Sequence, residues 1–255
     1  MLHFQEAGQG TPVILLHAFP LSSELWQPQM AAVPDGFRFI APDLPGFGAS
    51  PGFDEDPSIE HIANAVAGML EHLGLRQPVI LGGLSMGGYA ALAFARLFPE
   101  WLRALILADT RAEADTPEGK QGRDKMIALA ESEGAPAVVE QMLPKLLGET
   151  TQRERADVAD TVRGIAAKQS ATAIANALRA LRDRPAALDL LPQIQVPALV
   201  VVGDEDTLTP PDMARTLASN IPNAKLEIIP RAGHLSNIEQ PEEFNRALRD
   251  FLSEF

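Results

Sequence analysis

The sequence predicts an α/β fold in which a mostly parallel central sheet has helices on both faces and carries one helical insertion. Three observations indicate this fold class. Short apolar runs typical of buried strands alternate with helical patterns along most of the chain. This alternation stops between residues 111 and 187, where no convincing strand pattern occurs. A serine segment, Gly83-Leu84-Ser85-Met86-Gly87, directly follows one of the apolar runs.

The strands and helices of the predicted core fall in two parts of the chain. We expect strands at residues 2–6, 13–16, 38–41, 79–81 and 105–107, and again at 197–202 and 226–229. Asp56 and Pro57 read as the cap and first position of a helix that continues to about residue 73. A final helix places Phe244, Ala247, Leu248, Phe251 and Leu252 on one face. Residues 1–110 and 188–255 are therefore predicted to form one core.

Residues 111–187 are predicted to form a helical lid, or cap, on that core. Apolar residues recur at helical spacing at about residues 126–130, 138–147, 158–165 and 174–181. Ligands of open α/β sheets bind at the carboxyl edge of the strands, so a lid over that edge would cover a site. A run of ordinary surface helices is the alternative interpretation.

Composition limits the class of protein and its partners. The chain has 255 residues, of which 46% are apolar, so it can bury a sizeable core. Its formal net charge of −13 disfavours nucleic acids and anionic membranes as partners, and leaves a homo-oligomer open. It has no cysteine, which excludes disulfides and thiolate chemistry. Without a signal sequence or a membrane-length apolar run, we expect a cytoplasmic protein.

Ser85 is the predicted nucleophile. A strand ends before it and an Ala-rich helix follows it, so the chain must turn sharply at this serine. Gly83 and Gly87 allow the backbone to pass closely on either side. A serine hydroxyl is a weak nucleophile that needs a base to take its proton and a third group to orient that base.

The base can be sought among five histidines. His3 lies at the terminus, and His61 and His72 fall off the apolar stripe of their helix. His17 closes an early strand and is expected to shape the loop that follows. His234 comes just after the last predicted strand, where loops reach the edge of the sheet, and is the predicted general base.

The acid is predicted to follow a strand between the serine and the histidine. Asp204, Glu205 and Asp206 all come after the strand at 197–202. A carboxylate close to the strand end would stay beneath the site, and Asp206 lies furthest from that end; Asp204 is the second candidate, and the family resemblance given below decides between them. Asp109, after an earlier strand, is a rarer alternative and is also typical of a turn or helix cap.

Backbone N–H groups are expected to stabilise a developing oxyanion. Met86 follows the nucleophile at the start of a helix, where the helix dipole adds to the effect of its N–H. The second donor is expected in the loop after the strand at 13–16. Phe19 is favoured there because Pro20 has no N–H to donate.

Substrate contacts are predicted for Phe19, Trp26 and Arg111. Phe19 and Trp26, together with Met86 and Phe94, are candidates for an acyl pocket, although each is also typical of ordinary core. Arg111 follows a strand end and is a candidate partner for a substrate carboxylate, although most arginines are solvated or paired at the surface.

No cofactor or metal is predicted. The glycine-rich segment at residues 43–50 lacks the spacing of a phosphate-binding loop and reads as a structural turn near the oxyanion loop. The sequence has no metalloprotease, EF-hand or Cys/His pattern.

The chain resembles the α/β-hydrolase superfamily over almost its whole length. The matching segments are His17-Ala18-Phe19-Pro20, Asp43-Leu44-Pro45-Gly46-Phe47-Gly48-Ala49-Ser50, Gly83-Leu84-Ser85-Met86-Gly87-Gly88, Gly203-Asp204-Glu205-Asp206 and Gly233-His234. In this family the acid usually sits three residues after the glycine that ends its strand, which selects Asp206. The resemblance thus implies a catalytic triad of Ser85, Asp206 and His234.

The segment around His234 suggests a branch of this superfamily. Residues 232–241 look like those of 3-oxoadipate enol-lactonases and their esterase relatives, and cofactor-free haloperoxidase or perhydrolase-type esterases share a similar core. A haloalkane dehalogenase would need an aspartate where Ser85 stands. The resemblance implies a serine hydrolase that cleaves a small ester or lactone through an acyl-enzyme on Ser85. A C–C bond hydrolase, a perhydrolase and a non-catalytic ligand receptor of the same fold remain alternatives.

Overall fold

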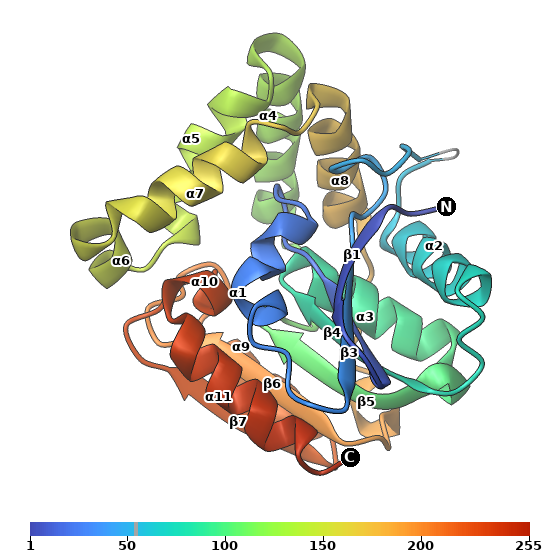
Figure 1. Cartoon of the computed structure of the whole chain (residues 1–255). Coiled ribbons are helices and arrows are strands. Elements are labelled where there is room, and N and C mark those ends of the chain that lie inside the picture. Colours follow the sequence, from blue (N-terminus) through green and yellow to red (C-terminus); the bar gives the residue numbers. More distant parts are fainter. Residues whose placement is uncertain (54–55) are drawn as a thin grey trace.

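The strands form one sheet of seven in the computed structural model, which describes residues 1–53 and 56–255 (Figure 1). The strands are β1 (Phe4–Gly8), β2 (Thr11–Leu16), β3 (Phe37–Pro42), β4 (Val79–Leu84), β5 (Leu102–Ala108), β6 (Ala198–Gly203) and β7 (Ala224–Ile229). Their order across the sheet is β1-β3-β2-β4-β5-β6-β7. Only β1 runs antiparallel to its neighbour, so the sheet is mostly parallel, as predicted.

The inner strands are apolar throughout because layers of helix exclude water from both faces. Every residue of β4 and of β6 is buried, which is typical of strands in a parallel sheet. In β7, at the edge, exposed positions alternate with partly buried ones. The carboxyl ends of the inner strands therefore form a rigid base for the loops that follow them.

Helices of the core cover both faces of this sheet. They are α1 (Gln27–Met30), α2 (Ile59–His72), α3 (Met86–Leu97), α9 (Pro211–Asn220), α10 (Ser236–Glu239) and α11 (Pro241–Leu252). α3 lies against β2, β4 and β5 and packs with α2, whereas α1, α10 and α11 pack together on the opposite face (Figure 1). α9 lies against β6 and β7.

Between β5 and β6 the chain forms a separate layer of helices. They are α4 (Pro117–Glu133), α5 (Ala135–Leu146), α6 (Glu149–Glu154), α7 (Ala156–Ala166) and α8 (Ala171–Asp183). α4 packs against α8 and α5, and α5 packs against α7. Figure 1 shows this layer beyond the carboxyl ends of the strands. We call residues 111–187 the helical insertion. None of the helices in the described part of the chain is both long and apolar enough to cross a membrane.

Several elements differ from those expected from the sequence. α2 begins at Ile59, and the hydroxyl of Ser58 caps it by accepting the N–H of His61 at 3.1 Å. The prediction that Asp56 and Pro57 begin this helix is therefore wrong. β1 spans Phe4–Gly8 rather than residues 2–6, because these are the residues that pair with β3. The short helix α6 was not predicted.

Candidate active site

Ser85 lies in the turn between β4 and α3, where the backbone takes an uncommon conformation. Its φ of 54° is in the left-handed region, which is rare for a residue with a side chain. Its N–H donates to the carbonyl of Ala108 at 2.9 Å, and its carbonyl accepts the hydroxyl of Thr110 at 2.9 Å. A Cβ at Gly87 would overlap the carbonyl of Leu16, so only glycine fits there. These contacts hold the serine side chain at the carboxyl end of the sheet.

His234 joins Ser85 to an acid. Its Nε2 lies 2.7 Å from Ser85 Oγ, and its Nδ1 lies 2.8 Å from Asp206 Oδ2. An ionised Asp206 accepts the Nδ1–H, which leaves Nε2 free to accept the serine proton. The imidazole is almost fully buried. Three side chains far apart in the sequence thus form one hydrogen-bonded line.

Asp206 is held by the turn that precedes α9. The N–H groups of Leu208 and Thr209 donate to its Oδ1 at 2.8 and 3.0 Å, and the Thr209 hydroxyl donates to its Oδ2 at 2.6 Å. Burial acts to raise the pKa of Asp206, but the charge of His234 and these hydrogen bonds outweigh it, and the net shift is downward. Thr209 was not singled out from the sequence, although a threonine three residues after an aspartate is a signal for such a turn.

Asp204, the second candidate acid, points to a different partner. It is exposed, and its carboxylate accepts the backbone N–H of Arg231 at 2.7 Å. It therefore supports the turn after β7, and Asp206 is the residue after β6 that contacts the ring of His234.

Asp109 is fully buried behind the line of catalytic candidates. Its Oδ1 accepts the N–H of Gly203 at 2.9 Å, and its Oδ2 lies 2.5 Å from the hydroxyl of Ser236. Burial, and next the negative charge of Asp206, raise the pKa of Asp109 well above its ordinary value. This buried carboxyl group bridges two loops and supports the site without joining the line, in keeping with the alternative interpretation as a turn or cap.

His17 supports the loop that carries Phe19. Its Nε2 accepts the N–H of Leu44 at 2.9 Å, and its Nδ1 lies 3.0 Å from the carbonyl oxygen of Ala18. Burial lowers the pKa of His17 to about 4, so the ring is neutral at pH 7. His17 shapes this loop and does not titrate near neutrality, as predicted.

The glycine-rich segment at residues 43–50 packs against the same loop. The carboxylate of Asp43 accepts the N–H groups of Ser23 at 2.9 Å and Ala49 at 3.0 Å. The ring of Phe47 meets the ring of His17 edge-on, with centroids 5.2 Å apart. The prediction that this segment is a structural turn is confirmed.

Phe19 and Met86 are placed where an oxyanion hole would need them. Phe19 lines the same cavity as Ser85, and Met86 follows Ser85 as the first residue of α3, with its side chain fully buried. Within residues 1–53 and 56–255, neither backbone N–H has a hydrogen-bond partner. Both donors are thus available to an incoming oxygen, and their role in an oxyanion hole stays a prediction.

A cavity of about 440 Å³ contains Ser85 and His234. This volume is within the range of small-molecule sites, about 300–1,000 Å³. The core contributes Phe19, Tyr89, Leu208 and Thr209 to its wall. The helical insertion contributes Arg111, Asp115, Glu118, Gly119, Gly122, Arg123, Lys125, Met126, Gln141, Met142, Lys145, Leu146 and Leu181. The insertion therefore supplies most of the surface that a ligand would meet.

The three residues predicted to contact substrate do not all reach this cavity. Phe19 and Arg111 are part of its lining. Trp26 is not, because it is 1% exposed and packs in the core with its ring 6.0 Å from that of Phe244. Phe94 is likewise fully buried. An aromatic residue near the oxyanion loop in sequence can face the core, which the sequence does not reveal.

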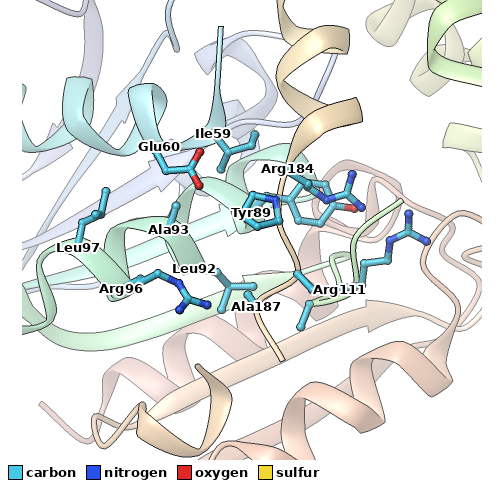
Figure 2. Close-up of a pocket in the computed structure, with 13 residues that line it drawn as sticks. Ile59, Glu60, Tyr89, Leu92, Ala93, Arg96, Leu97, Arg111, Arg184 and Ala187 are labelled. Atoms are coloured by element: carbon cyan, nitrogen blue, oxygen red, sulfur yellow. The ribbon is translucent and has the colours of Figure 1, made fainter. Parts of the chain in front are cut away.

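A second, smaller pocket of about 40 Å³ shares Tyr89 and Arg111 with the cavity (Figure 2). The guanidinium of Arg184 lies over the ring of Tyr89, 4.1 Å from its centroid. This stacking joins α3 to the end of the insertion. The pocket is too small for an organic substrate.

The turn between α5 and α6 is hydrogen-bonded to the loop of the candidate base. The carbonyl of Leu146 accepts the backbone N–H of His234 at 3.1 Å. The N–H of Gly148 donates to Glu239 at 2.8 Å, and the same carboxyl group accepts the N–H of Leu235 at 3.0 Å. The insertion and the His234 loop therefore share buried hydrogen bonds.

The same turn also contacts the loop of the candidate acid. Glu205 directly precedes Asp206, and its carboxylate accepts the N–H of Thr150 at 2.7 Å and the Thr150 hydroxyl at 2.5 Å. The start of α6 is thus capped by a carboxylate of the core, which suits the positive end of the helix dipole. Insertion and core form one hydrogen-bonded unit here.

Comparison with known proteins gives a consistent result. A family model described as "alpha/beta hydrolase fold" matches residues 11–241. The solved structure of a thermophilic esterase from Thermogutta terrifontis, with malate bound, has a TM-score of 0.96 and 40% sequence identity, and the match covers 99% of this chain and 93% of that one.

Two curated relatives are similar over more than nine-tenths of their length. The 2-hydroxy-6-oxo-6-phenylhexa-2,4-dienoate hydrolase of Burkholderia cepacia is 31% identical, with 99% of this chain and 91% of that protein covered. The 3-oxoadipate enol-lactonase 2 of Acinetobacter baylyi is 27% identical, with 100% and 94% covered. The expected resemblance to enol-lactonases is thereby confirmed.

Proposed function

The chain belongs to the α/β-hydrolase family and is a hydrolase, and on that premise we propose that it cleaves a small carboxylic ester or lactone through an acyl-enzyme on Ser85. The observation that carries this proposal is the line from Asp206 through His234 to Ser85, with distances of 2.8 and 2.7 Å. The names of the T. terrifontis esterase and the A. baylyi lactonase support an ester or lactone as the substrate.

The first half of the reaction forms the acyl-enzyme. Ser85 Oγ attacks the substrate carbonyl carbon while its proton passes to Nε2 of His234. The N–H groups of Phe19 and Met86 stabilise the oxyanion, and each is worth about 3 kcal/mol of transition-state free energy. The bond to the leaving alkoxide then breaks, and His234 returns the proton to that oxygen.

The second half releases the acid. A water molecule gives a proton to His234 Nε2 and attacks the acyl carbon, and the proton then returns to Ser85 Oγ as the ester bond to the serine breaks. Asp206 stays ionised throughout and stabilises the imidazolium that forms in both halves. The helical insertion acts as a lid that limits the water reaching this cavity.

Hydrolysis of a C–C bond is the second candidate function. The B. cepacia relative, at 31% identity, is named as a dienoate hydrolase. Such chemistry requires polar groups in the lid, and the insertion places Arg111, Arg123 and Asp115 in the wall of the cavity. An assay with a 2-hydroxy-6-oxodienoate decides between the two reactions. Loss of the absorbance of the dienoate would show that the C–C bond is cleaved.

The decisive experiment combines labelling with turnover. We expect a fluorophosphonate probe to label Ser85 and p-nitrophenyl acetate to be hydrolysed with steady turnover. Ser85→Ala should abolish both while the protein remains folded, and Ser253→Ala, at the exposed C-terminus, should change neither. Tight ligand retention without turnover would instead support a receptor. Peracid formation from acetate and hydrogen peroxide tests for a perhydrolase activity.

A further inference from the structure

Three guanidinium groups share one buried carboxylate in the wall of the cavity. Asp115 Oδ1 accepts from Arg111 at 2.5 Å and from Arg184 at 2.9 Å, and its Oδ2 accepts from Arg123 at 3.1 Å. The side chain of Asp115 is 2% exposed. One carboxylate balances one of these charges, so the cluster keeps an excess of positive charge where water is scarce.

Only one of the three arginines has its donors largely used within the protein. Arg184 donates to the carbonyls of Leu181 at 2.7 Å and Glu113 at 3.1 Å, pairs with Asp115, and stacks on Tyr89 (Figure 2). Its side chain is 3% exposed, and it is not part of the lining of the cavity that holds Ser85. Its role is therefore structural.

Arg111 and Arg123 both line the cavity and keep donors that no contact among the described residues uses. Each guanidinium carries five N–H bonds, and each of these two arginines uses one nitrogen to contact Asp115. The Nε of Arg111 is buried and donates to no residue in the part of the chain that the structure describes. Their side chains are 20% and 21% exposed, so both are partly desolvated. Such guanidinium groups can bind both oxygens of a carboxylate at once.

The charge of the cavity wall is opposite to that of the whole molecule. Four cationic side chains line it, Arg111, Arg123, Lys125 and Lys145, against the carboxylates of Asp115 and Glu118. The chain as a whole carries a formal charge of −13. An anion is repelled by most of the surface and attracted at this site, which is a pattern expected of recognition rather than of chance.

Backbone and side-chain contacts hold Arg111 near the nucleophile. Thr110, the preceding residue, donates its hydroxyl to the carbonyl of Ser85 at 2.9 Å. Tyr89 and Arg111 line the same cavity as Ser85. The cluster and the serine thus belong to one cavity and are held in a fixed relation.

We propose that Arg111 and Arg123 bind a carboxylate group of the substrate, at a position remote from the carbonyl that Ser85 attacks. The substrate class is then a half-ester of a dicarboxylic acid, or a lactone that bears a free carboxylate. Asp115 and Arg184 position the guanidinium groups of these two arginines. The substrate class rests on the proposed hydrolysis of an ester or lactone. The binding of a carboxylate rests only on the residues that line the cavity.

The experiment compares substrates that differ only in the charged group. Monomethyl adipate has a carboxylate where methyl hexanoate has a methyl group. We expect kcat/KM to favour the half-ester by about tenfold or more, since hydrogen bonds to a charged group are stronger than those between neutral groups. Arg111→Met and Arg123→Met should each reduce this ratio about tenfold. Asp115 keeps two guanidinium partners in either variant, so both should fold.

Arg96→Met is the matched control. Arg96 lies in the smaller pocket and pairs with Asp189 at 2.8 Å, so its loss changes the net charge equally without touching the cavity wall. The ratio should stay at the wild-type value. Wild-type enzyme that hydrolyses both esters equally well, or Arg96→Met that lowers the ratio as much as Arg111→Met, would overturn the anion site while leaving the proposed hydrolysis intact.

Calorimetry separates the two proposals if no ester is turned over. Glutarate and adipate are titrated into the Ser85→Ala protein and into the same protein with Arg111→Met. Binding that the second substitution weakens about tenfold supports the site even where hydrolysis fails. No heat of binding, or equal affinity in both proteins, contradicts it.

Discussion

The hydroxyl oxygen of Ser236 lies 2.5 Å from Oδ2 of Asp109, and this contact joins the loop of His234 to the end of β5. The other oxygen of Asp109 accepts the N–H of Gly203, three residues before Asp206. The loops of the acid and of the base are therefore both fastened to one buried carboxyl group, which the reaction itself does not use.

Asp109→Asn should gain stability relative to the wild type as pH rises. In the unfolded chain this carboxyl ionises near its ordinary pKa of 3.8, whereas in the folded protein its pKa is raised, first by burial. Between these pKa values the folded state binds the extra proton, so wild-type stability falls as pH increases. Asparagine does not titrate. Urea denaturation gives the free energy of unfolding of each protein. The value for Asp109→Asn minus that for the wild type should be larger at about pH 7 than at about pH 4. A constant difference contradicts this expectation.

Asp206→Asn should lower kcat by about 10³–10⁴-fold with little change in thermal stability. The amide favours the wrong imidazole tautomer, so Nε2 can no longer accept the serine proton. Asp204→Asn is the control, because its exposed carboxylate contacts Arg231 and not the imidazole. Steady-state kinetics on one ester would test the pair. Similar losses in both variants would show that the wrong acid has been assigned.

Thr209→Val should reduce kcat about tenfold, because Asp206 loses a hydrogen bond to its charged form. The hydroxyl of Thr209 lies 2.6 Å from Asp206 Oδ2. Removing it raises the pKa of Asp206 and frees the carboxylate to move. Thr209→Ser keeps the hydroxyl and should restore most of the activity. If serine and valine behaved alike, the methyl group of Thr209 and not its hydroxyl would be what matters.

Acidification should destabilise the protein through His17. Its pKa is 6.5 in the unfolded chain and about 4 when buried, so the unfolded state binds more protons in this interval and stability falls as pH falls. The loss attributable to His17 between pH 7 and pH 5 is about 2 kcal/mol. His17→Gln has no titrating group and should lose correspondingly less, as urea denaturation at the two pH values can show. Equal losses in both proteins would mean that other groups dominate the pH dependence.

The sequence predicted those parts of the site that depend on local rules. A glycine-flanked serine after a strand, and a histidine after the last strand, follow from turn geometry and from where parallel strands end. These rules predict that Ser85 and His234 lie at the same edge of the sheet. The choice of Asp206 over Asp204 depended on family resemblance, because one sequence does not show which of two nearby carboxylates turns toward the ring.

The rest depended on contacts between distant segments. Trp26 is predicted to contact the substrate, but its ring packs against Phe244 of α11. No local sequence pattern indicates this contact. The ion cluster around Asp115 joins Arg111, Arg123 and Arg184 from separate parts of the insertion. Six-residue α6 has little intrinsic helical stability and is held at its start by Glu205, a residue of the core.

The turn between α5 and α6 sets a boundary for protein engineering. Residues 146–151 are part of the insertion in sequence, yet they are fastened to both Glu205 and the backbone of His234. A chimera that receives the insertion of a relative should therefore keep this turn with its native catalytic loops, and splice on either side of it. Exchange of α4 and α8 changes the cavity wall and leaves residues 146–151 in place. Specificity and catalytic competence can then be redesigned separately within one scaffold.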